Sequence, residues 1–198
     1  MELFQILHTR RNIRNFLPEP VPQDVLLKLI DATRYAPSGA NKNPWRFLIT
    51  TDKDALTRLG ETARTCNWLA SAPAGIVIMA DTSSSRYWLE DCCVAAYAIW
   101  LTATDLGLGV AWGAMYQSDN PEESERRQKH VRQILSVPDN LAIPMLLAVG
   151  YPDPEKPPAE RKRVAVEDIV CWERYPSGDA EMRYWKVFSA LFPREEWQ

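Results

Sequence analysis

The fold is decided by the stretch AGIVIMA, residues 74–80, which is apolar throughout and rich in β-branched side chains. A half-exposed strand alternates apolar and polar residues, whereas a strand without that alternation is buried on both of its faces. The stretch IPMLLAVG, residues 143–150, has the same character. Because both faces of such strands must be covered, the sequence predicts a three-layer sandwich of helices, sheet and helices.

The segments around these two stretches supply the other expected elements. WRFLIT (45–50) and VAWGAM (110–115) are expected to form strands. In the first long helix, Val25, Leu26, Leu29 and Ile30 share one face. Helices are expected over residues 1–9, 19–36, 52–64, 86–109 and 120–137. The fourth of these is the longest and is expected to be mostly buried.

Composition and charge limit the class of protein. A hydrophobic content of 46% is that of a globular chain, and a net charge of -3 disfavours nucleic-acid binding, which usually needs a basic surface. The longest uncharged apolar-rich run, residues 92–104, is too short to span a bilayer. The N-terminus lacks the apolar core of a secretory signal. We therefore expect a cytoplasmic protein that neither crosses a membrane nor binds nucleic acid.

The cysteine pattern also favours a cytoplasmic protein. The sequence contains no C-x-x-C pair among its cysteines, which are Cys66, Cys92, Cys93 and Cys171. Cys92 and Cys93 are adjacent, and adjacent residues on a helix point to different sides. We therefore expect no zinc site and no disulfide scaffold, but reduced thiols.

The run RRNIR, residues 10–14, is a candidate anion-binding segment. On a helix that continued from residues 1–9, Arg10 and Arg14 would share a face and Arg11 would lie off it. Two guanidinium groups on one side form a clamp for a phosphate. A solvated basic patch explains the same run equally well. Arginines at 161 and 163 provide a second source of positive charge.

The loop YAPSGANKNPWRF, residues 35–47, contains more small and amide-bearing residues than a plain connection needs. Pro37 stops the preceding helix at Ala36, and Gly39 allows close approach of the backbone to a ligand. The Ser38 hydroxyl and the amides of Asn41 and Asn43 can donate and accept hydrogen bonds. Such a loop suits the mixed polar edge of a flavin ring, and it is equally consistent with an ordinary polar loop.

Other catalytic signatures are missing from the sequence. It contains no G-x-S-x-G and no P-loop, and its two histidines are far apart. GLGVAWG, residues 107–113, follows a helix and enters a strand, which is the reverse of a dinucleotide-binding turn. We interpret its first two glycines as a helix end and a strand entry.

These motifs together resemble the FMN-dependent nitroreductase family. RRNIRNFLPEPVP resembles its opening R-R-S-x-R, and APSGANKNPWRF resembles its A-P-S-x-x-N-x-Q-P-W-x-F. DLGLGVAWGAM resembles the glycine-bearing segment after the central helix. IPMLLAVGYP with RKRVAVEDIV resembles the closing pattern. The matches occur in the right order from Arg10 to Val170.

The resemblance implies an α+β fold, a three-layer α/β/α sandwich with a mostly antiparallel central sheet. It also implies which residues bind FMN. The phosphate and ribityl run corresponds to Arg10, Arg11, Asn12 and Arg14, and the loop at the flavin ring to Pro37, Ser38, Gly39 and Asn41. The segment that passes near the ring corresponds to Trp112, Gly113 and Ala114, and a ring-contacting asparagine to Asn67. The closing phosphate arginine corresponds to Arg163, with Arg161 as a nearby alternative.

The implied function is that of an FMN-dependent oxidoreductase. NADH or NADPH would give hydride to the flavin, and a nitroaromatic, a quinone or a related small aromatic acceptor would then be reduced by a ping-pong mechanism. No side chain is needed as a catalytic group and no metal is implied. The alternatives are a relative that destroys its flavin or dehydrogenates a small metabolite, and a non-enzymatic FMN-binding module.

The resemblance further implies a homodimer with FMN at the subunit interface. We expect an FMN-binding domain over residues 1–170 and an aromatic C-terminal extension over 171–198 that contacts the partner. The sequence departs from the family pattern at Asn12, which replaces Ser, at Asn43, which replaces Gln, and at residues 164–166. No counterpart of the deiodinase lid occurs between residues 52 and 86, so deiodination is not expected.

Overall fold

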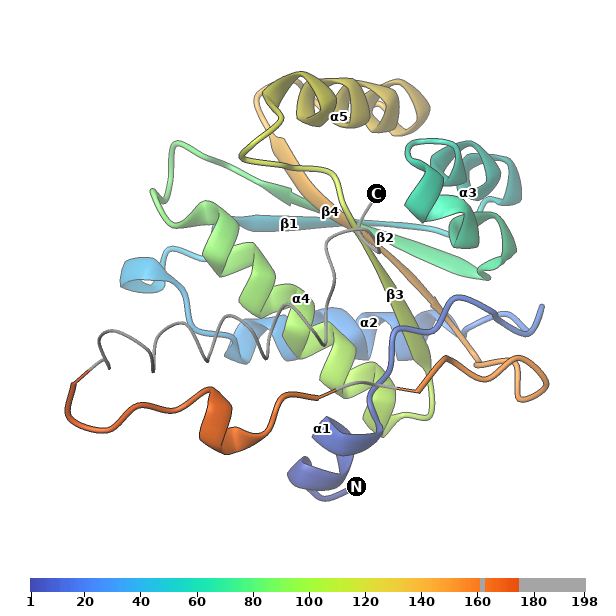
Figure 1. Cartoon of the computed structure of the whole chain (residues 1–198). Helices are drawn as coiled ribbons and strands as arrows, with labels where there is room; N and C mark the ends of the chain where they lie inside the picture. The colour runs from blue at the N-terminus through green and yellow to red at the C-terminus, as the bar shows by residue number, and fades with distance from the viewer. Residues whose placement is uncertain (161–162, 175–198) are drawn as a thin grey trace. The chain divides into compact units, whose positions relative to one another are not determined.

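The computed structural model describes residues 1–160 and 163–174. The chain divides into two compact units, Met1–Pro158 and Ala159–Gln198. The first unit contains a four-stranded antiparallel sheet in the order β1-β2-β4-β3 (Figure 1). Its strands are β1 (Trp45–Thr50), β2 (Ala74–Ala80), β3 (Gly109–Ala114) and β4 (Ala142–Gly150). The four expected strands and the antiparallel sheet are thus confirmed.

Five α-helices surround the sheet in the described part of the chain. They are α1 (Leu3–Thr9), α2 (Gln23–Ala32), α3 (Lys53–Gly60), α4 (Trp88–Asp105) and α5 (Pro121–Leu135). Short 3-10 helices are η1 (Thr33–Tyr35), η2 (Gly39–Asn41), η3 (Arg64–Ser71) and η4 (Val166–Asp168). The helix expected over 19–36 ends earlier as an α-helix, at Ala32, and continues through η1 to Ala36. The sequence pattern did not predict η3.

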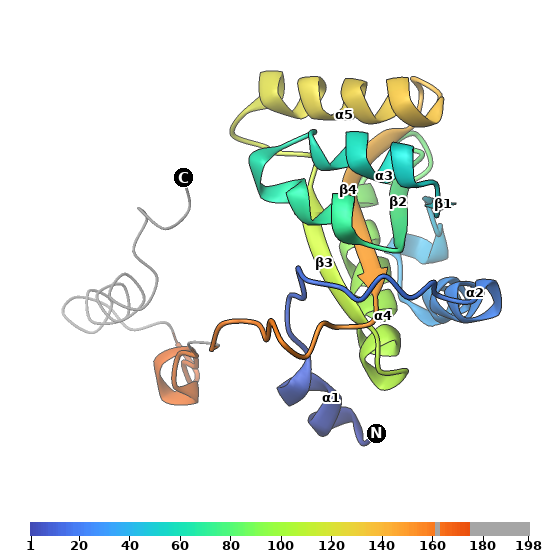
Figure 2. The same ribbon diagram turned by 90° about the vertical axis from the view of Figure 1, so that its right-hand side faces the viewer.

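The two faces of the sheet are covered by different helices. In β2, Ile76 and Ile78 point into a core shared with α2 and α4. Val77 and Met79, which alternate with them, point into a second core shared with α3, η3 and α5. Figures 1 and 2 show α3 and α5 on one side of the sheet and α2 and α4 on the other. The three-layer sandwich predicted from residues 74–80 is confirmed.

Helix α4 is the longest helix of the described chain, and it is buried on one face only. Ala95, Ala96 and Ile99 are fully buried against the sheet, whereas Val94 and Tyr97 remain 40% and 39% exposed. The helix ends at Asp105, and Gly107 follows with a φ of 76°, a left-handed conformation that glycine adopts without strain. Of the two glycines expected to end the helix, Gly107 and Gly109, the structure has Gly107 in this role, and Gly109 begins β3. No helix among the described residues has the length and apolar character needed to cross a membrane.

The second unit is described over 159–160 and 163–174. It contains η4, and its apolar side chains Val166, Ile169 and Trp172 are exposed. Most of the expected aromatic extension, residues 175–198, lies outside the described residues, as does Arg161.

Two leucines of α2 allow a direct test of which face of this helix is buried in the core. Leu29 of α2 is fully buried, whereas Leu27, two positions earlier, is 54% exposed. Leu29→Ala should lower the free energy of unfolding by about 2–5 kcal/mol, because it leaves a cavity in the core. Leu27→Ala should change it by about 0.5 kcal/mol or less. Denaturant unfolding at one fixed protein concentration measures both, and equal effects would contradict the assignment of α2's buried face.

Candidate functional site

The arginine run lies along the free edge of β3. Helix α1 ends at Thr9, and Arg10 already has extended backbone with ψ 126°. Asn12 forms a parallel bridge with Val110, and the Ile13 N–H donates to the Val110 carbonyl at 2.9 Å. Residues 10–14 therefore do not continue the helix, and Arg10 and Arg14 do not share a helix face. The backbone leaves the helix because its polar groups pair with the edge of the sheet.

Aromatic side chains of α4 hold the first arginine in place. The Arg10 guanidinium lies 4.3 Å from the centroid of the Trp100 ring and 5.9 Å from that of Tyr97. Trp100 also donates its Nε1–H to the Arg11 carbonyl at 3.3 Å. A cation over an aromatic face is attracted by the ring quadrupole, so these contacts fix the position of Arg10. Within the described chain, Arg11 and Arg14 form no ion pair, which leaves their charge available at this edge.

Asn12 joins the arginine run to the segment Trp112–Ala114. Its Oδ1 accepts from the Trp112 N–H at 3.2 Å, and the Trp112 ring lies 5.9 Å from that of Trp100. Gly113 lies directly against the Cys66 and Trp68 side chains of η3. The structure thus brings residues 10–14 and 112–114 together, with η3 alongside. Asn67 is exposed on η3, between the two residues that contact Gly113.

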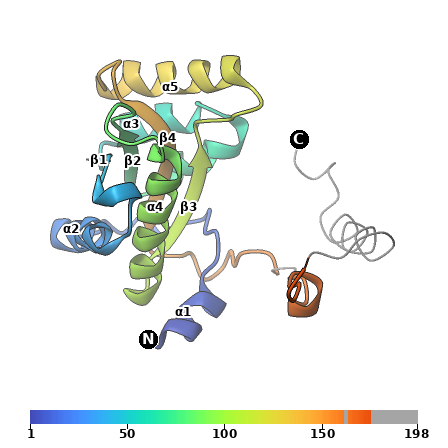
Figure 3. The ribbon, with the colours of Figure 1, turned by 90° about the vertical axis from the view of Figure 1, so that its left-hand side faces the viewer.

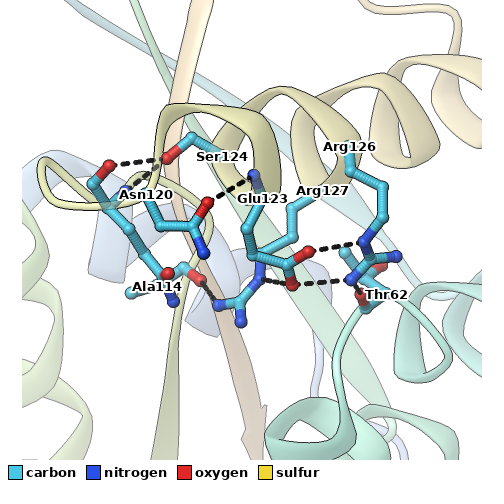
Figure 4. A network of polar contacts seen from close by, with 8 residues as sticks. Thr62, Ala114, Asn120, Glu123, Ser124, Arg126 and Arg127 are labelled. Carbon is cyan, nitrogen blue, oxygen red and sulfur yellow. Dashed lines mark hydrogen bonds and ion pairs between the residues drawn. The ribbon is translucent and has the colours of Figure 1, made fainter.

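A polar network anchors the end of β3 to α5 (Figure 4). Arg127 donates to the Ala114 carbonyl at 2.9 Å and to Glu123 at 2.6 Å. Arg126 bonds the same carboxylate and the Thr62 carbonyl. Hydrogen bonds from Arg126 and Arg127 lower the pKa of Glu123 to about 2. The network keeps the segment around Ala114 in a defined position relative to α5.

The second predicted half of the site, loop 37–44, satisfies its own polar groups. Ser38 Oγ donates to Asn43 Oδ1 at 3.1 Å and accepts from the Asn43 N–H at 3.0 Å. Asn43 Nδ2 donates to the Asn41 carbonyl at 3.2 Å. Ala40, Asn41 and Asn43 all have positive φ values, of 49°, 56° and 46°. Several non-glycine residues in this region mark a strained segment, and strain of this kind concentrates at ligand-binding sites.

The two halves lie toward opposite ends of α4 in one chain. The loop is tied to the first turn of the helix, since the Gly39 N–H donates to Asp91 at 2.8 Å. Arg10 lies over Trp100, nine residues later, which is roughly 14 Å along the helix axis. Figures 1 and 3 show α1 at the C-terminal end of α4 and the loop at the other end.

The remaining predicted site residues differ in their exposure to solvent. Pro37 and Asn41 are exposed, and Ser38 and Gly39 are half-buried. Arg163 is exposed and belongs to the second unit, and Arg161 lies outside the described residues. Asp91, Tyr97 and Trp100 were not predicted from the sequence as part of the site. A signal for Asp91 was present, because an acidic residue inside a helix expected to be buried needs partners.

Comparison with known proteins decides the family. The sequence profile described as "Nitroreductase family" matches residues 7–80 and 62–151, which together span most of the chain. The chain belongs to the nitroreductase family. The expected resemblance and the expected α+β nitroreductase fold are therefore confirmed.

Individual nitroreductase relatives agree with this assignment. A putative NADH dehydrogenase/NAD(P)H nitroreductase of Archaeoglobus fulgidus is 32% identical over 159 residues, covering 78% of this chain and 88% of that protein. The crystal structure of a putative NADH dehydrogenase/NAD(P)H nitroreductase from Bacteroides thetaiotaomicron is similar with a TM-score of 0.78 and 27% identity, covering 88% and 99%. The FMN-dependent nitroreductase of Clostridium difficile R20291 is similar with a TM-score of 0.74 and 29% identity, covering 87% and 99%.

Relatives named for other activities also match this nitroreductase-family chain. An iodotyrosine deiodinase of Thermotoga neapolitana is 27% identical, covering 83% of this chain and 96% of that protein. A 5,6-dimethylbenzimidazole synthase of Rhodospirillum rubrum is 25% identical, covering 78% and 84%. Membership in the nitroreductase family therefore does not by itself define the reaction that this chain catalyses.

The Glu123 network predicts a specific acid sensitivity. Its pKa of about 2 lies below the ordinary value of 4.5, so ionised Glu123 stabilises the fold fully above about pH 5. That contribution is lost as the pH falls through 4 toward 2. Glu123→Gln should therefore lower the free energy of unfolding by about 1 kcal/mol at pH 7, because solvent screens this ion pair, and by progressively less toward pH 2. Denaturant unfolding at several pH values measures the difference.

Glu125, two positions later and beyond the first turn of α5, provides the control. It is exposed and forms no ion pair with any residue that the structure describes, so Glu125→Gln should change neither the free energy of unfolding nor its pH dependence appreciably. The difference in free energy of unfolding between the wild type and Glu123→Gln should shrink as the pH falls. If that difference stays constant from pH 7 to pH 2, the electrostatic role of Glu123 is refuted.

Proposed function

We propose that this chain is an FMN-dependent oxidoreductase that uses NADH or NADPH to reduce nitroaromatics, quinones or related small aromatic acceptors. The observation that carries the proposal is the arginine run, which lies against the edge of β3 beside Trp112–Ala114. It places cationic donors next to a segment of small and aromatic residues. A flavin nucleotide needs cationic donors at its phosphate end, and it needs small and aromatic groups at its ring end.

The arginine run fits a phosphate. Arg10 is held over Trp100, so little side-chain freedom is lost when it binds an anion. Arg11 and Arg14 carry positive charge that no described carboxylate neutralises by an ion pair. Asn12 uses its oxygen to hold Trp112, and its amide N–H groups remain as donors within the described structure. Charge-assisted hydrogen bonds from guanidinium groups are strong phosphate contacts.

The Trp112–Ala114 segment and loop 37–44 fit the ring end. Ala114 is exposed and has a small side chain, so an aromatic ligand can approach its backbone closely, whereas Gly113 is buried and lets Cys66 and Trp68 pack against the strand. Trp112 is packed against Trp100, which keeps its ring in a fixed orientation. Loop 37–44 would donate backbone and amide N–H groups to a polar ring edge. Bound FMN would supply the redox chemistry, accepting hydride from the nicotinamide and passing reducing equivalents to the second substrate.

The chain's own residues therefore bind and orient rather than attack. Arg10 and Arg14 would hold the phosphate, the segment Trp112–Ala114 would contact the ring, and loop 37–44 would bind the ring edge. Buried Cys66 beside Gly113 has its thiol pKa raised by burial, so it stays protonated and takes no nucleophilic part. No side chain is required to form a covalent bond with the substrate.

The phosphate assignment is tested by comparing two flavins. Arg14→Ala should weaken FMN binding roughly tenfold to a hundredfold, because a charge-assisted hydrogen bond to the phosphate is lost. Riboflavin, which has no phosphate, should lose much less affinity on the same substitution. Fluorescence titration of the FMN-free protein measures both. Arg58→Ala, an exposed arginine on α3 with a long 3.8 Å ion pair, is the control and should change neither affinity.

Equal weakening of FMN and riboflavin would show that Arg14 is structural. A correctly folded protein that takes up neither flavin would refute the proposed function itself.

We further propose that the functional unit is a homodimer. A solvent-facing stripe is formed by Tyr87, the residue just before α4, and by Val94 and Tyr97 of the helix, which are 51%, 40% and 39% exposed. Leu101, four residues beyond Tyr97, continues it as a half-buried residue. A helix with apolar residues on all sides is normally buried on all sides. A second copy of the chain that presents the same stripe would cover it.

The ends of α4 support an antiparallel pairing of two such helices. In an isologous interface, each surface patch meets its own copy. An antiparallel α4 pair would place the N-terminal end of one helix beside the C-terminal end of the other. Loop 37–44 of one chain would then meet the arginine run of its partner, which unites the two halves that a single chain keeps apart. Each dimer would contain two such sites.

A mixing experiment tests shared sites. One variant is Arg14→Ala, and the other is the double variant Ser38→Ala with Asn41→Ala. After random subunit exchange, half of the dimers are heterodimers with one intact site each, so roughly a quarter of wild-type activity should return. NADH oxidation with a quinone acceptor measures it. No recovery despite proven exchange, or a monomer that binds FMN, would contradict shared sites, as would a melting temperature independent of protein concentration.

A second candidate reaction is supported by the relative named 5,6-dimethylbenzimidazole synthase. The same arginine run and loop would bind FMN, but the flavin itself would be consumed. Mass analysis of the flavin after repeated turnover with NADH separates the two. Intact FMN with reduced acceptor supports the proposed oxidoreductase, whereas loss of FMN supports the second candidate.

A further inference from the structure

We infer that Asp91 is a positioning residue that clamps loop 37–44 in its strained conformation from inside helix α4. The inference that this clamp also sets the affinity for the flavin ring rests on the proposed function. The clamp itself does not, because it is a property of the chain alone.

The carboxylate of Asp91 is buried and held by neutral donors. Asp91 is 5% exposed, its Oδ1 accepts from the Gly39 N–H at 2.8 Å, and its Oδ2 accepts from the Ser85 hydroxyl at 2.8 Å. The structure gives it no ion pair with a described cation. Its place in the first turn of α4 puts it near the positive end of the helix dipole. A buried carboxylate is costly, so its two hydrogen bonds are hard to give up.

The second donor is itself fixed. Ser85 is 7% exposed, and its Oγ accepts from the Tyr87 N–H at 3.1 Å while it donates to Asp91. Because Ser85 Oγ accepts from Tyr87, the position of its hydroxyl group is fixed, and the hydrogen bond that it donates fixes the orientation of the Asp91 carboxylate. The remaining oxygen of Asp91 points at Gly39. Asp91 thus links the segment before α4 to the loop before β1.

The loop depends on this link because its own tip is strained. Residues 38–43 contain the three positive φ values and bond mainly among themselves. Their other hydrogen bond to the described chain is a long one, from Arg46 Nη1 to the Asn43 carbonyl at 3.4 Å. The Gly39–Asp91 bond is therefore the strongest polar tie between the loop tip and the core. Without it, relaxation of the left-handed residues would be opposed only weakly.

Gly39 is the residue that permits the tie. A Cβ at this position would lie 2.6 Å from Cδ2 of Tyr87, which is closer than packed atoms tolerate. The loop backbone therefore rests directly on the Tyr87 ring, and the short approach brings the Gly39 N–H within reach of Asp91. A larger residue at 39 would push the loop away from the carboxylate.

Limited proteolysis of the FMN-free protein tests the clamp. Lys42 is exposed at the loop tip, so trypsin cleavage of the Lys42–Asn43 bond reports opening of the loop. Asp91→Ala should raise the rate of that cleavage roughly tenfold or more, because it removes a charge-assisted hydrogen bond. Asp91→Asn should give a smaller increase, because an amide oxygen can still accept from Gly39. The fragment 43–198 is followed by mass spectrometry.

Glu90→Ala is the matched control. Glu90 lies in the same turn of α4 and carries the same charge, but it is exposed and has no bond to the loop. Its cleavage rate at Lys42 should equal that of the wild type. Should Asp91→Ala fail to fold, Gly39→Ala opens the loop by collision with Tyr87, and adding Tyr87→Ala should restore slow cleavage.

FMN affinity provides the second readout. Asp91→Ala should weaken FMN and riboflavin about equally, since it acts on the ring end, whereas Arg14→Ala should affect FMN selectively. Unchanged cleavage at Lys42 in Asp91→Ala, or an equal rise at distant sites such as Lys129, would overturn the clamp. Faster cleavage with unchanged flavin affinity would overturn the positioning role. If the wild type binds no flavin, the proposed function fails, and the cleavage rates still decide the clamp.

Discussion

Strands β2 and β4 leave neither of their faces to solvent, and the arrangement of the first unit follows from that constraint. Ile76 and Ile78 need one covering layer, while Val77 and Met79 need another. Since each buried aliphatic side chain contributes about 1.5–3 kcal/mol, exposure of either face would remove much of the driving force for folding. The helices therefore occupy both sides, and the edges β1 and β3 become the places where other segments can attach.

The edge at β3 is where this constraint becomes useful for binding. The chain after α1 pairs its backbone with Val110, which aligns the arginine run with the sheet. Asn12 then adds a side-chain bond to Trp112, and Arg127 holds the far end of the strand at Ala114. A surface that would otherwise expose unpaired backbone groups is converted into an edge with fixed cationic and aromatic groups.

Helix α4 connects this edge to the loop before β1. Its buried face packs on the sheet, Trp100 supports Arg10, and Asp91 holds Gly39. The outer stripe with Val94 and Tyr97 is left partly exposed. One helix thus carries both halves of the proposed site at separate positions along its length.

The sequence by itself determined the layers, the strands and the family. Uninterrupted apolar runs such as residues 74–80 and the order of the motifs are local properties, which do not depend on how distant segments meet. Tertiary structure decided the rest. The extended conformation of residues 10–14 comes from pairing with Val110, which overrides the helical tendency of the preceding segment. The mutual bonds of Ser38 and Asn43, the burial of Asp91 and the cation–aromatic contact of Arg10 likewise join groups whose distances only the packed chain sets.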